Sequence, residues 1–276
     1  MDILTYSFMQ RALLVGFLLG IIVPMIGVIM VSKRLAMVGD ALSHGSLAGV
    51  TIGLIIGFNP ILGATAFAIF SALSIEFIRK KIPRYSEMSI AILTSTGIGL
   101  AGLLSGFVDN ASNFNSFLFG SIVAINDFEM QLVTIITVVV MTTFVLFYKE
   151  FFYIALDERS ARLSGVNVNV INFISTMMTA VTVSIAARSV GALIVSSLMV
   201  IPVASAMQLA KSYKQTIQYS IIFGVLFTVG GLFISYHLSL KPGGTIVLIG
   251  VLTLLVLFVV KAVIQKQKEK RVLHGK

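Results

Sequence analysis

The sequence predicts an all-α membrane protein, a polytopic bundle of about eight to nine transmembrane helices. Hydrophobic residues make up 57% of the 276 residues, charged residues only 11%, and mean hydropathy is +1.02. A soluble domain has about 25% charged residues, so this chain has too few to cover a surface in water. Apolar runs long enough to cross a bilayer recur throughout, and no polar stretch between them is long enough to fold separately. Residues 1–276 are therefore expected to form a single transmembrane domain.

Nine apolar runs define the expected helices in order. They lie at 9–31, 35–57, 60–78, 88–107, 130–148, 168–187, 190–210, 216–236 and 244–262. Most of the 20 lysine and arginine residues fall in the connections on one side of these spans. The positive-inside rule places that side in the cytoplasm, with the N-terminus outside and a basic tail at 261–276 inside. The net charge of +9 thus sets orientation and does not indicate nucleic-acid binding.

The sequence excludes several chemistries outright. It contains no cysteine, which excludes thiolate metal sites, structural zinc clusters and disulfides. Any metal site must use carboxylate, imidazole, hydroxyl or carbonyl groups. A G-x-x-x-x-G-K-[ST] phosphate loop does not occur, so ATP hydrolysis is not expected of this chain. The H-E-x-x-H motif of a metalloprotease is also missing, and no enzyme is predicted.

The most informative motif is Gly39-Asp40-Ala41-Leu42-Ser43-His44, inside the second apolar run. A spacing of four residues puts Asp40 and His44 on one face of a helix, one turn apart. A carboxylate in hydrocarbon costs about 2.5–3.5 kcal/mol on insertion scales unless something compensates it. A divalent cation beside the imidazole would do so, which predicts a metal path. A purely structural hydrogen bond between the two side chains is the alternative.

Asp40 is the only acid that the apolar runs place well inside a span. Along a continuous helix from Lys33, His44 would lie about 16 Å deep, close to the midplane of the bilayer. Glu129 is expected in an outer loop, and Glu76 at an inner helix end beside Arg79 as an i,i+3 ion pair. A secondary transporter driven by ion gradients needs several intramembrane acids. A single deep acid argues against that class.

Three glycines follow the Asp40 motif at four-residue spacing, Gly45, Gly49 and Gly53. This is a close-packing stripe of the kind that lets transmembrane helices approach each other. At about 100° per residue, the stripe points roughly 160° away from the Asp40 and His44 face. One face of this helix is expected to pack on a neighbour while the other looks into a cavity.

The second informative stretch is 155–167, on the side expected to be cytoplasmic. Acidic residues come early, basic residues late, and Gly165 ends it, which is the order that a short helix favours. The stretch is interpreted either as a docking element for a partner or as an exposed connecting helix. The candidate docking residues are Asp157, Glu158, Arg159, Arg162 and Gly165.

These segments together resemble the permease subunit of ATP-binding-cassette importers for zinc, manganese and iron. The matching segments are Lys33–His44, Ala155–Gly165 and Val190–Ala206, with a weaker match at Phe117–Ile122. The resemblance implies a homodimeric permease in the plasma membrane of a bacterium. It also implies a separate ATPase subunit gripping the 155–167 loop, and an extracellular metal-binding lipoprotein or periplasmic protein that delivers the ion. No permanently bound cofactor is implied.

The resemblance also implies roles for single residues. Asp40 and His44 would receive the cation, with zinc favoured and manganese next. The family often has an acid where Ser239 stands, and His237 is the nearby side chain that can bind metal. Pro202 could kink its helix for gating or give a static bend. Arg188 would either seal an outer gate or anchor a loop. A permease for a siderophore, haem or cobalamin chelate shares the architecture and is the alternative within this class.

Overall fold

The computed structural model describes residues 6–82, 85–108, 116–120 and 125–274, and within them it holds helices and no strand. The helices that form the bundle are α1 (Ser7–Ser32), α2 (Val38–Ile56), α3 (Pro60–Lys81), α4 (Ser86–Ser105), α6 (Asp127–Leu146), α9 (Val168–Ala186), α10 (Ala192–Leu209), α11 (Tyr213–Leu238) and α12 (Pro242–His274). Two short helices, α7 (Tyr148–Leu156) and α8 (Glu158–Leu163), and a π-helical turn, η3 (Ala187–Gly191), lie between them. The all-α bundle predicted from the sequence is confirmed.

Among the described residues, eight helices are long and apolar enough to cross a membrane, and one of them is the 42-residue stretch Val168–Leu209. A straight helix of that length would measure about 63 Å, twice the hydrocarbon core. Instead the stretch doubles back at Gly191, whose φ of 106° is outside the range of ordinary L-residues. Asn172, near its start, bonds to α8, and just beyond its end the ring of Tyr213 lies 5.4 Å from that of Phe152 on α7. Both ends therefore lie at the same end of the bundle, so this stretch supplies two spans, α9 and α10, and the described residues hold nine spanning-length helices, within the expected eight to nine.

The boundaries of α2 follow from local backbone chemistry. Residues 33–37 form a turn in which Arg34 has a φ of 59°, so α1 and α2 are separate helices. Gly57 ends α2 with a φ of 75°, the left-handed conformation that favours glycine at a helix C-terminus. Two residues later, the side chain of Asn59 accepts a hydrogen bond from the Ile61 amide and starts α3.

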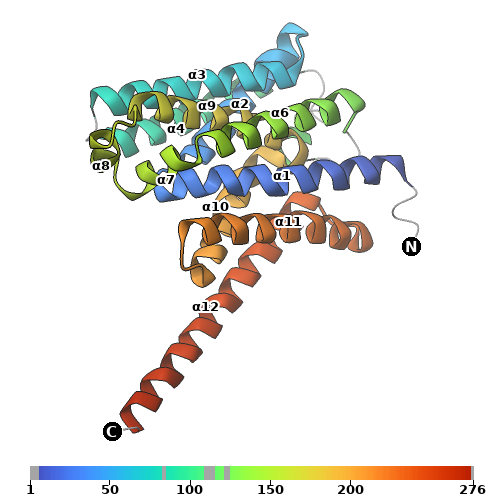
Figure 1. Ribbon diagram of the computed structural model, residues 1–276. Coiled ribbons are helices and arrows are strands. Elements are labelled where there is room, and N and C mark those ends of the chain that lie inside the picture. The colour runs from blue at the N-terminus through green and yellow to red at the C-terminus, as the bar shows by residue number, and fades with distance from the viewer. Residues whose placement is uncertain (1–5, 83–84, 109–115, 121–124, 275–276) are drawn as a thin grey trace.

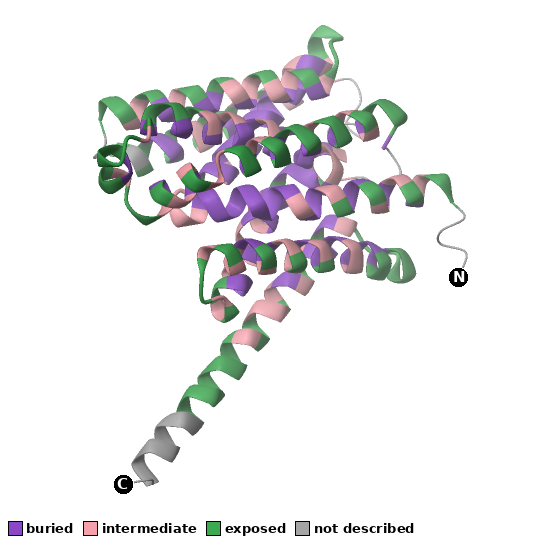
Figure 2. Ribbon diagram, in the orientation of Figure 1, coloured by how far each residue is buried: buried purple, intermediate pink, exposed green. Residues whose placement is uncertain are grey.

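The centre of the bundle holds α1 and α2. Helix α1 packs mainly on α11 and α10, and α2 lies against α3, α4 and α10 (Figure 1). Most of α1 is buried, while α12 leaves the body of the bundle and is largely exposed (Figure 2). The expected basic tail continues α12 as helix to His274, and residues 275–276 lie outside the described residues. The exposed apolar side chains of α12, such as Leu248 and Leu252, face lipid or another chain in a membrane.

Candidate metal site

Asp40 occupies the first turn of α2, where the helix dipole favours a negative charge. The turn at 33–37 breaks the continuous helix from which the distance of about 16 Å between Lys33 and His44 was estimated, so that assumption is wrong. His44 lies about 9 Å along α2 from Val38. The carboxylate is therefore compensated partly by its position at a helix N-terminus, before any cation is considered.

The two side chains of the motif face each other across one helical turn. His44 Nε2 lies 3.8 Å from Asp40 Oδ1, too far for a hydrogen bond between them. Zinc ligand distances of about 2.0–2.2 Å would let one cation contact both atoms. Ser196 of α10 donates a hydrogen bond of 3.3 Å to Asp40 Oδ1 and adds a hydroxyl oxygen to the same site. A carboxylate, an imidazole and a hydroxyl thus converge from two helices.

Both metal-capable side chains reach the surface of the single chain. The Asp40 side chain is 30% exposed and that of His44 15% exposed, although both belong to an apolar spanning helix. Acyl chains do not solvate a carboxylate, so the exposed part of the Asp40 side chain must face water or another polar group. The site is reachable from outside the chain and is not sealed within the bundle.

The other faces of α2 are closed by tight contacts. A side chain at Gly45 would meet Ser71 Oγ at 2.7 Å, one at Gly49 would collide with the backbone of Gly63, and one at Gly53 would crowd Pro60. All three glycines therefore face α3. Gly97 allows the backbone of α4 to lie directly against the backbone of α2 at His44, because a Cβ at Gly97 would lie 2.7 Å from the His44 carbonyl carbon.

His237 does not join Asp40 and His44. It is exposed near the end of α11, and its Nδ1 lies 2.9 Å from the carbonyl oxygen of Phe233. No group of three or more histidine, aspartate or glutamate side chains that could share a metal occurs among the described residues. Any further ligands at Asp40 would be hydroxyl, carbonyl or water oxygens, or residues of another chain.

Two acids expected to be peripheral are buried. Glu129 was expected in an outer loop, but it is 5% exposed in the first turn of α6, and its Oε1 accepts a bond of 3.0 Å from Arg188 in η3. Glu76 is also 5% exposed and binds Arg79 through both carboxylate oxygens. Both acids lie near helix ends, and the expected ion pair of Glu76 with Arg79 is present. Their burial was not expected from the sequence, and the neighbouring arginines neutralise both carboxylates. The guanidinium of Arg188 also lies 4.6 Å from the centre of the Phe117 ring.

The loop at 155–167 contains the short helix α8. As the sequence predicted, an acidic residue lies in its first turn and a basic residue in its last turn. Asp157 caps α8 by accepting hydrogen bonds from the Ser160 amide at 2.8 Å and from its hydroxyl at 2.7 Å. These bonds, the hydroxyl first, lower the pKa of Asp157. Gly165 ends the element with a φ of 86°.

Four residues of α8 surround a cavity of about 430 Å³: Glu158, Arg159, Arg162 and Leu163.

Pro202 lies buried in α10, and the helix continues through it without a break. The discontinuity in this stretch is at η3, where the π-helical turn ends at Gly191. Gly191 and Gly120 both have positive φ and pack backbone to backbone, Gly120 against Val190 and Gly191 against Phe119. Segment 117–120 is thereby held on the turn between α9 and α10.

Comparison with known proteins decides the family. The ABC 3 transport family matches residues 5–261 of the chain. The chain belongs to this family. Its relatives carry names of membrane proteins and permeases of transport systems, and this ABC 3 chain is likewise a multi-pass membrane permease and not an enzyme.

Three curated relatives match over nearly their full length. A Treponema pallidum protein named "Probable metal transport system membrane protein" is 34% identical, covering 91% of this chain and 95% of the relative. A manganese transport system membrane protein of Listeria monocytogenes is 32% identical over 93% and 91%. A high-affinity zinc uptake system membrane protein of Haemophilus influenzae is 28% identical over 88% and 94%.

A solved structure has the same fold. PsaBC from Streptococcus pneumoniae in complex with Fab aligns with a TM-score of 0.84 and 28% identity, covering 93% of both chains. The resemblance to importer permeases noted in the sequence is confirmed at the level of family and fold. An ABC permease works with an ATPase and a substrate-binding protein.

Sequence reasoning missed several residues that shape the site. Ser196 contacts Asp40 across a separation of 156 residues, and Gly97 opens space for α4 against His44. Ser196 lies within the Val190–Ala206 segment that carried the family resemblance, which is the signal that could have found it. The sequence also did not indicate that the ammonium of Lys33 donates a partly buried hydrogen bond to Asn172.

Proposed function

We propose that this ABC 3 permease carries free divalent transition-metal ions, zinc or manganese, through the membrane in an ATP-driven importer. The observation that carries the proposal is the Asp40 and His44 pair, open to one side of an apolar helix with Ser196 beside it. Relatives named for manganese and for zinc transport support the same class of cargo. Carboxylate, imidazole and hydroxyl ligands suit both metals.

The partial exposure of Asp40 on the surface of the single chain favours a path between two copies of the chain. The charged face must meet water, and a second copy facing the first would enclose a polar channel away from lipid. A homodimer would also place two Asp40 and two His44 side chains near one route, supplying the ligands that one chain lacks. An extracellular metal-binding protein would load this route, with the N-terminus outside and the C-terminus in the cytoplasm, as the distribution of basic residues predicts.

The choice of metal is tested by competition in reconstituted complex. Zinc is the metal favoured by the sequence, so an excess of zinc is expected to suppress ATP-driven uptake of manganese more than manganese suppresses uptake of zinc. Uptake of labelled metal into proteoliposomes, with each ion competing against the other, measures this. Stronger suppression by manganese would contradict the zinc preference but not the metal-ion class.

Chelate transport is the alternative, and the same preparation separates it from transport of the bare ion. A cavity for a bulky siderophore, haem or cobalamin would not need a paired carboxylate and imidazole. Binding of free zinc or manganese by the purified complex supports our proposal. Binding of a chelate, without any affinity for the free ions, would overturn it.

Helix α8 is proposed as the docking element for the ATPase subunit. Its Leu163 side chain is 90% exposed and Leu156 just before it is 68% exposed, flanked by exposed Arg159 and Arg162. An apolar tip ringed by charge is typical of a surface that a partner covers.

Reversing the charge on α8 is expected to weaken this docking. Arg162→Glu should reduce co-purification of the ATPase subunit by about tenfold or more, because the new negative charge would face the acidic partner surface that the exposed Arg159 and Arg162 are proposed to meet. Quantitative pull-down on the tagged permease measures the ratio of the two subunits. Lys241→Glu, the same reversal at the opposite end of the bundle, is the control and should leave the ratio unchanged. Equal recovery with Arg162→Glu would contradict the docking role.

A further inference from the structure

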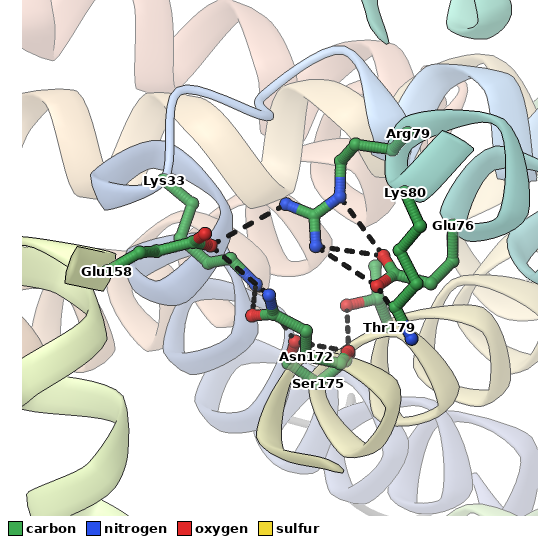
Figure 3. A network of polar contacts seen from close by, with 8 residues as sticks. All are labelled: Lys33, Glu76, Arg79, Lys80, Glu158, Asn172, Ser175 and Thr179. Atoms are coloured by element: carbon green, nitrogen blue, oxygen red, sulfur yellow. Dashed lines mark hydrogen bonds and ion pairs between the residues drawn. The ribbon is translucent and has the colours of Figure 1, made fainter. Parts of the chain in front are cut away.

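A polar network beneath α8 connects it to the turn that begins α2 (Figure 3). Its members come from the turn at Lys33, from α3, α8 and α9. The side-chain amide of Asn172 lies at its centre and is 4% exposed. The Asn172 Oδ1 accepts a hydrogen bond of 2.6 Å from Lys33 Nζ, and its Nδ2 donates one of 3.2 Å to Glu158 Oε1. One amide thus bridges the first residue of the α1–α2 turn and the first residue of α8.

The surrounding groups hold this bridge in place. Lys33 Nζ also donates to Ser175 Oγ at 3.3 Å. Arg79 of α3 contacts Glu158 at 3.7 Å and the buried Glu76 at 2.9 Å. Burial and the nearby Arg79 lower the pKa of Lys33 to about 8, against the opposing influence of Glu158 and Glu76. Lys33 is half-buried, and both of its side-chain hydrogen bonds go to α9, so its ammonium is held in one position.

The turn from Lys33 to Asp40 is short and internally bonded. Leu35 N donates to Met30 O at 2.8 Å, and Val38 N donates to Leu35 O at 3.0 Å, which closes the turn onto the end of α1. Gly39, next to Asp40, packs on the Met199 side chain of α10. A displacement applied at Lys33 therefore reaches the first turn of α2 through bonded backbone and close packing.

We propose that Lys33, Asn172 and Glu158 form a polar tie that transmits the position of α8 to Asp40. This inference rests on the proposed function, in which the ATPase moves α8 and Asp40 holds the metal. When the ATPase subunit shifts α8, Glu158 carries Asn172 and Lys33 with it, and the start of α2 is repositioned relative to Ser196. Lys33 is a positioning residue in this scheme and does not contact the ion.

Removing the lysine charge tests the tie. Lys33→Met keeps a long apolar stem and removes the ammonium, and it is expected to lower metal transported per ATP hydrolysed by about tenfold or more. Binding of the ATPase subunit, and of zinc or manganese at equilibrium, should stay near native. Arg34→Gln removes one positive charge from the same turn at an exposed position, and it should keep the native ratio of transport to hydrolysis. A native ratio in Lys33→Met would overturn the tie.

A second variant separates coupling from folding. Asn172→Leu should show the same defect, and the double variant Lys33→Met with Asn172→Leu should be little worse than either single variant, because all three break one connection. Defects that multiply in the double variant would show that the residues act independently, against the tie. Loss of folded permease or of the ATPase subunit in Lys33→Met would assign Lys33 a structural role and also overturn it. If Arg162→Glu leaves ATPase binding intact, the proposed docking fails, and the tie falls with it whatever Lys33→Met shows.

Discussion

Replacing Asp40 by asparagine is expected to reduce ATP-driven metal uptake by about a hundredfold or more, beyond the 10–100-fold typical of losing an outer-shell partner. Asparagine has nearly the same shape and still accepts a hydrogen bond from Ser196, so the packing of α2 on α10 is preserved. What is lost is the negative charge that attracts the cation. Uptake of labelled zinc or manganese into proteoliposomes containing the whole complex measures the effect.

The controls for Asp40→Asn keep the result specific. Asp127→Asn neutralises an exposed carboxylate in the first turn of α6, where it pairs with Arg11 at 2.9 Å, and it should transport normally. Recovery of the ATPase subunit should be unchanged in both variants. His44→Ala is expected to impair uptake in the same way, because it removes the imidazole 3.8 Å from Asp40. Native uptake by Asp40→Asn would defeat the assignment of the metal site.

Replacing Gly49 by alanine is expected to have the largest effect on the stability of the fold. The added methyl would collide with the carbonyl oxygen of Gly63 and lie 2.7 Å from the Cβ of Phe67. Since Gly63 presents its backbone and has no side chain to rotate, α2 and α3 must move apart. Overpacking of this kind typically costs about 1–3 kcal/mol, and here it also separates the helices that hold His44 in place. The unfolding temperature of the detergent-solubilised permease should fall by several degrees.

The matched control uses a glycine in open space. A methyl at Gly99 of α4 would meet no atom of the chain within 4 Å. Gly99→Ala should therefore keep or slightly raise the unfolding temperature, since alanine is the better helix former. A native unfolding temperature for Gly49→Ala would show that α2 and α3 can separate at no cost, contrary to the packing at Gly45, Gly49 and Gly53.

The sequence was a good guide to the helices, and a weaker guide to where they begin. It anticipated a break between the runs 9–31 and 35–57, at the basic pair Lys33 and Arg34, but it began the second run at residue 35, whereas α2 begins at Val38. It therefore did not show that Asp40 lies in the first turn of α2, where the helix dipole stabilises the carboxylate. The sequence predicted separate helices at 168–187 and 190–210. The structure has α9 and α10 there, joined by the π-helical turn η3, at whose last residue, Gly191, the chain reverses direction.

Some features of the candidate site follow from local sequence, and others depend on contacts between distant helices. The pairing of Asp40 with His44 follows from a spacing of four residues and needs only a helix. The burial of Glu129 by Arg188 across 59 residues does not follow from local pattern, since it depends on α6 meeting η3. The contacts of Ser196 with Asp40 and of Lys33 with Asn172 do not follow from local pattern for the same reason.

By itself, the sequence determined that this chain lies in a membrane, which stretches cross it and which two side chains share a helix face. It could do so because hydrocarbon demands about 20 apolar residues per crossing and a helix repeats every 3.6 residues, both properties of local sequence. Only the tertiary structure decided that Ser196 reaches Asp40 and that Lys33 reaches Asn172 across 139 residues. Those contacts depend on which helices pack together, and packing is set by the shapes of surfaces far apart in the chain.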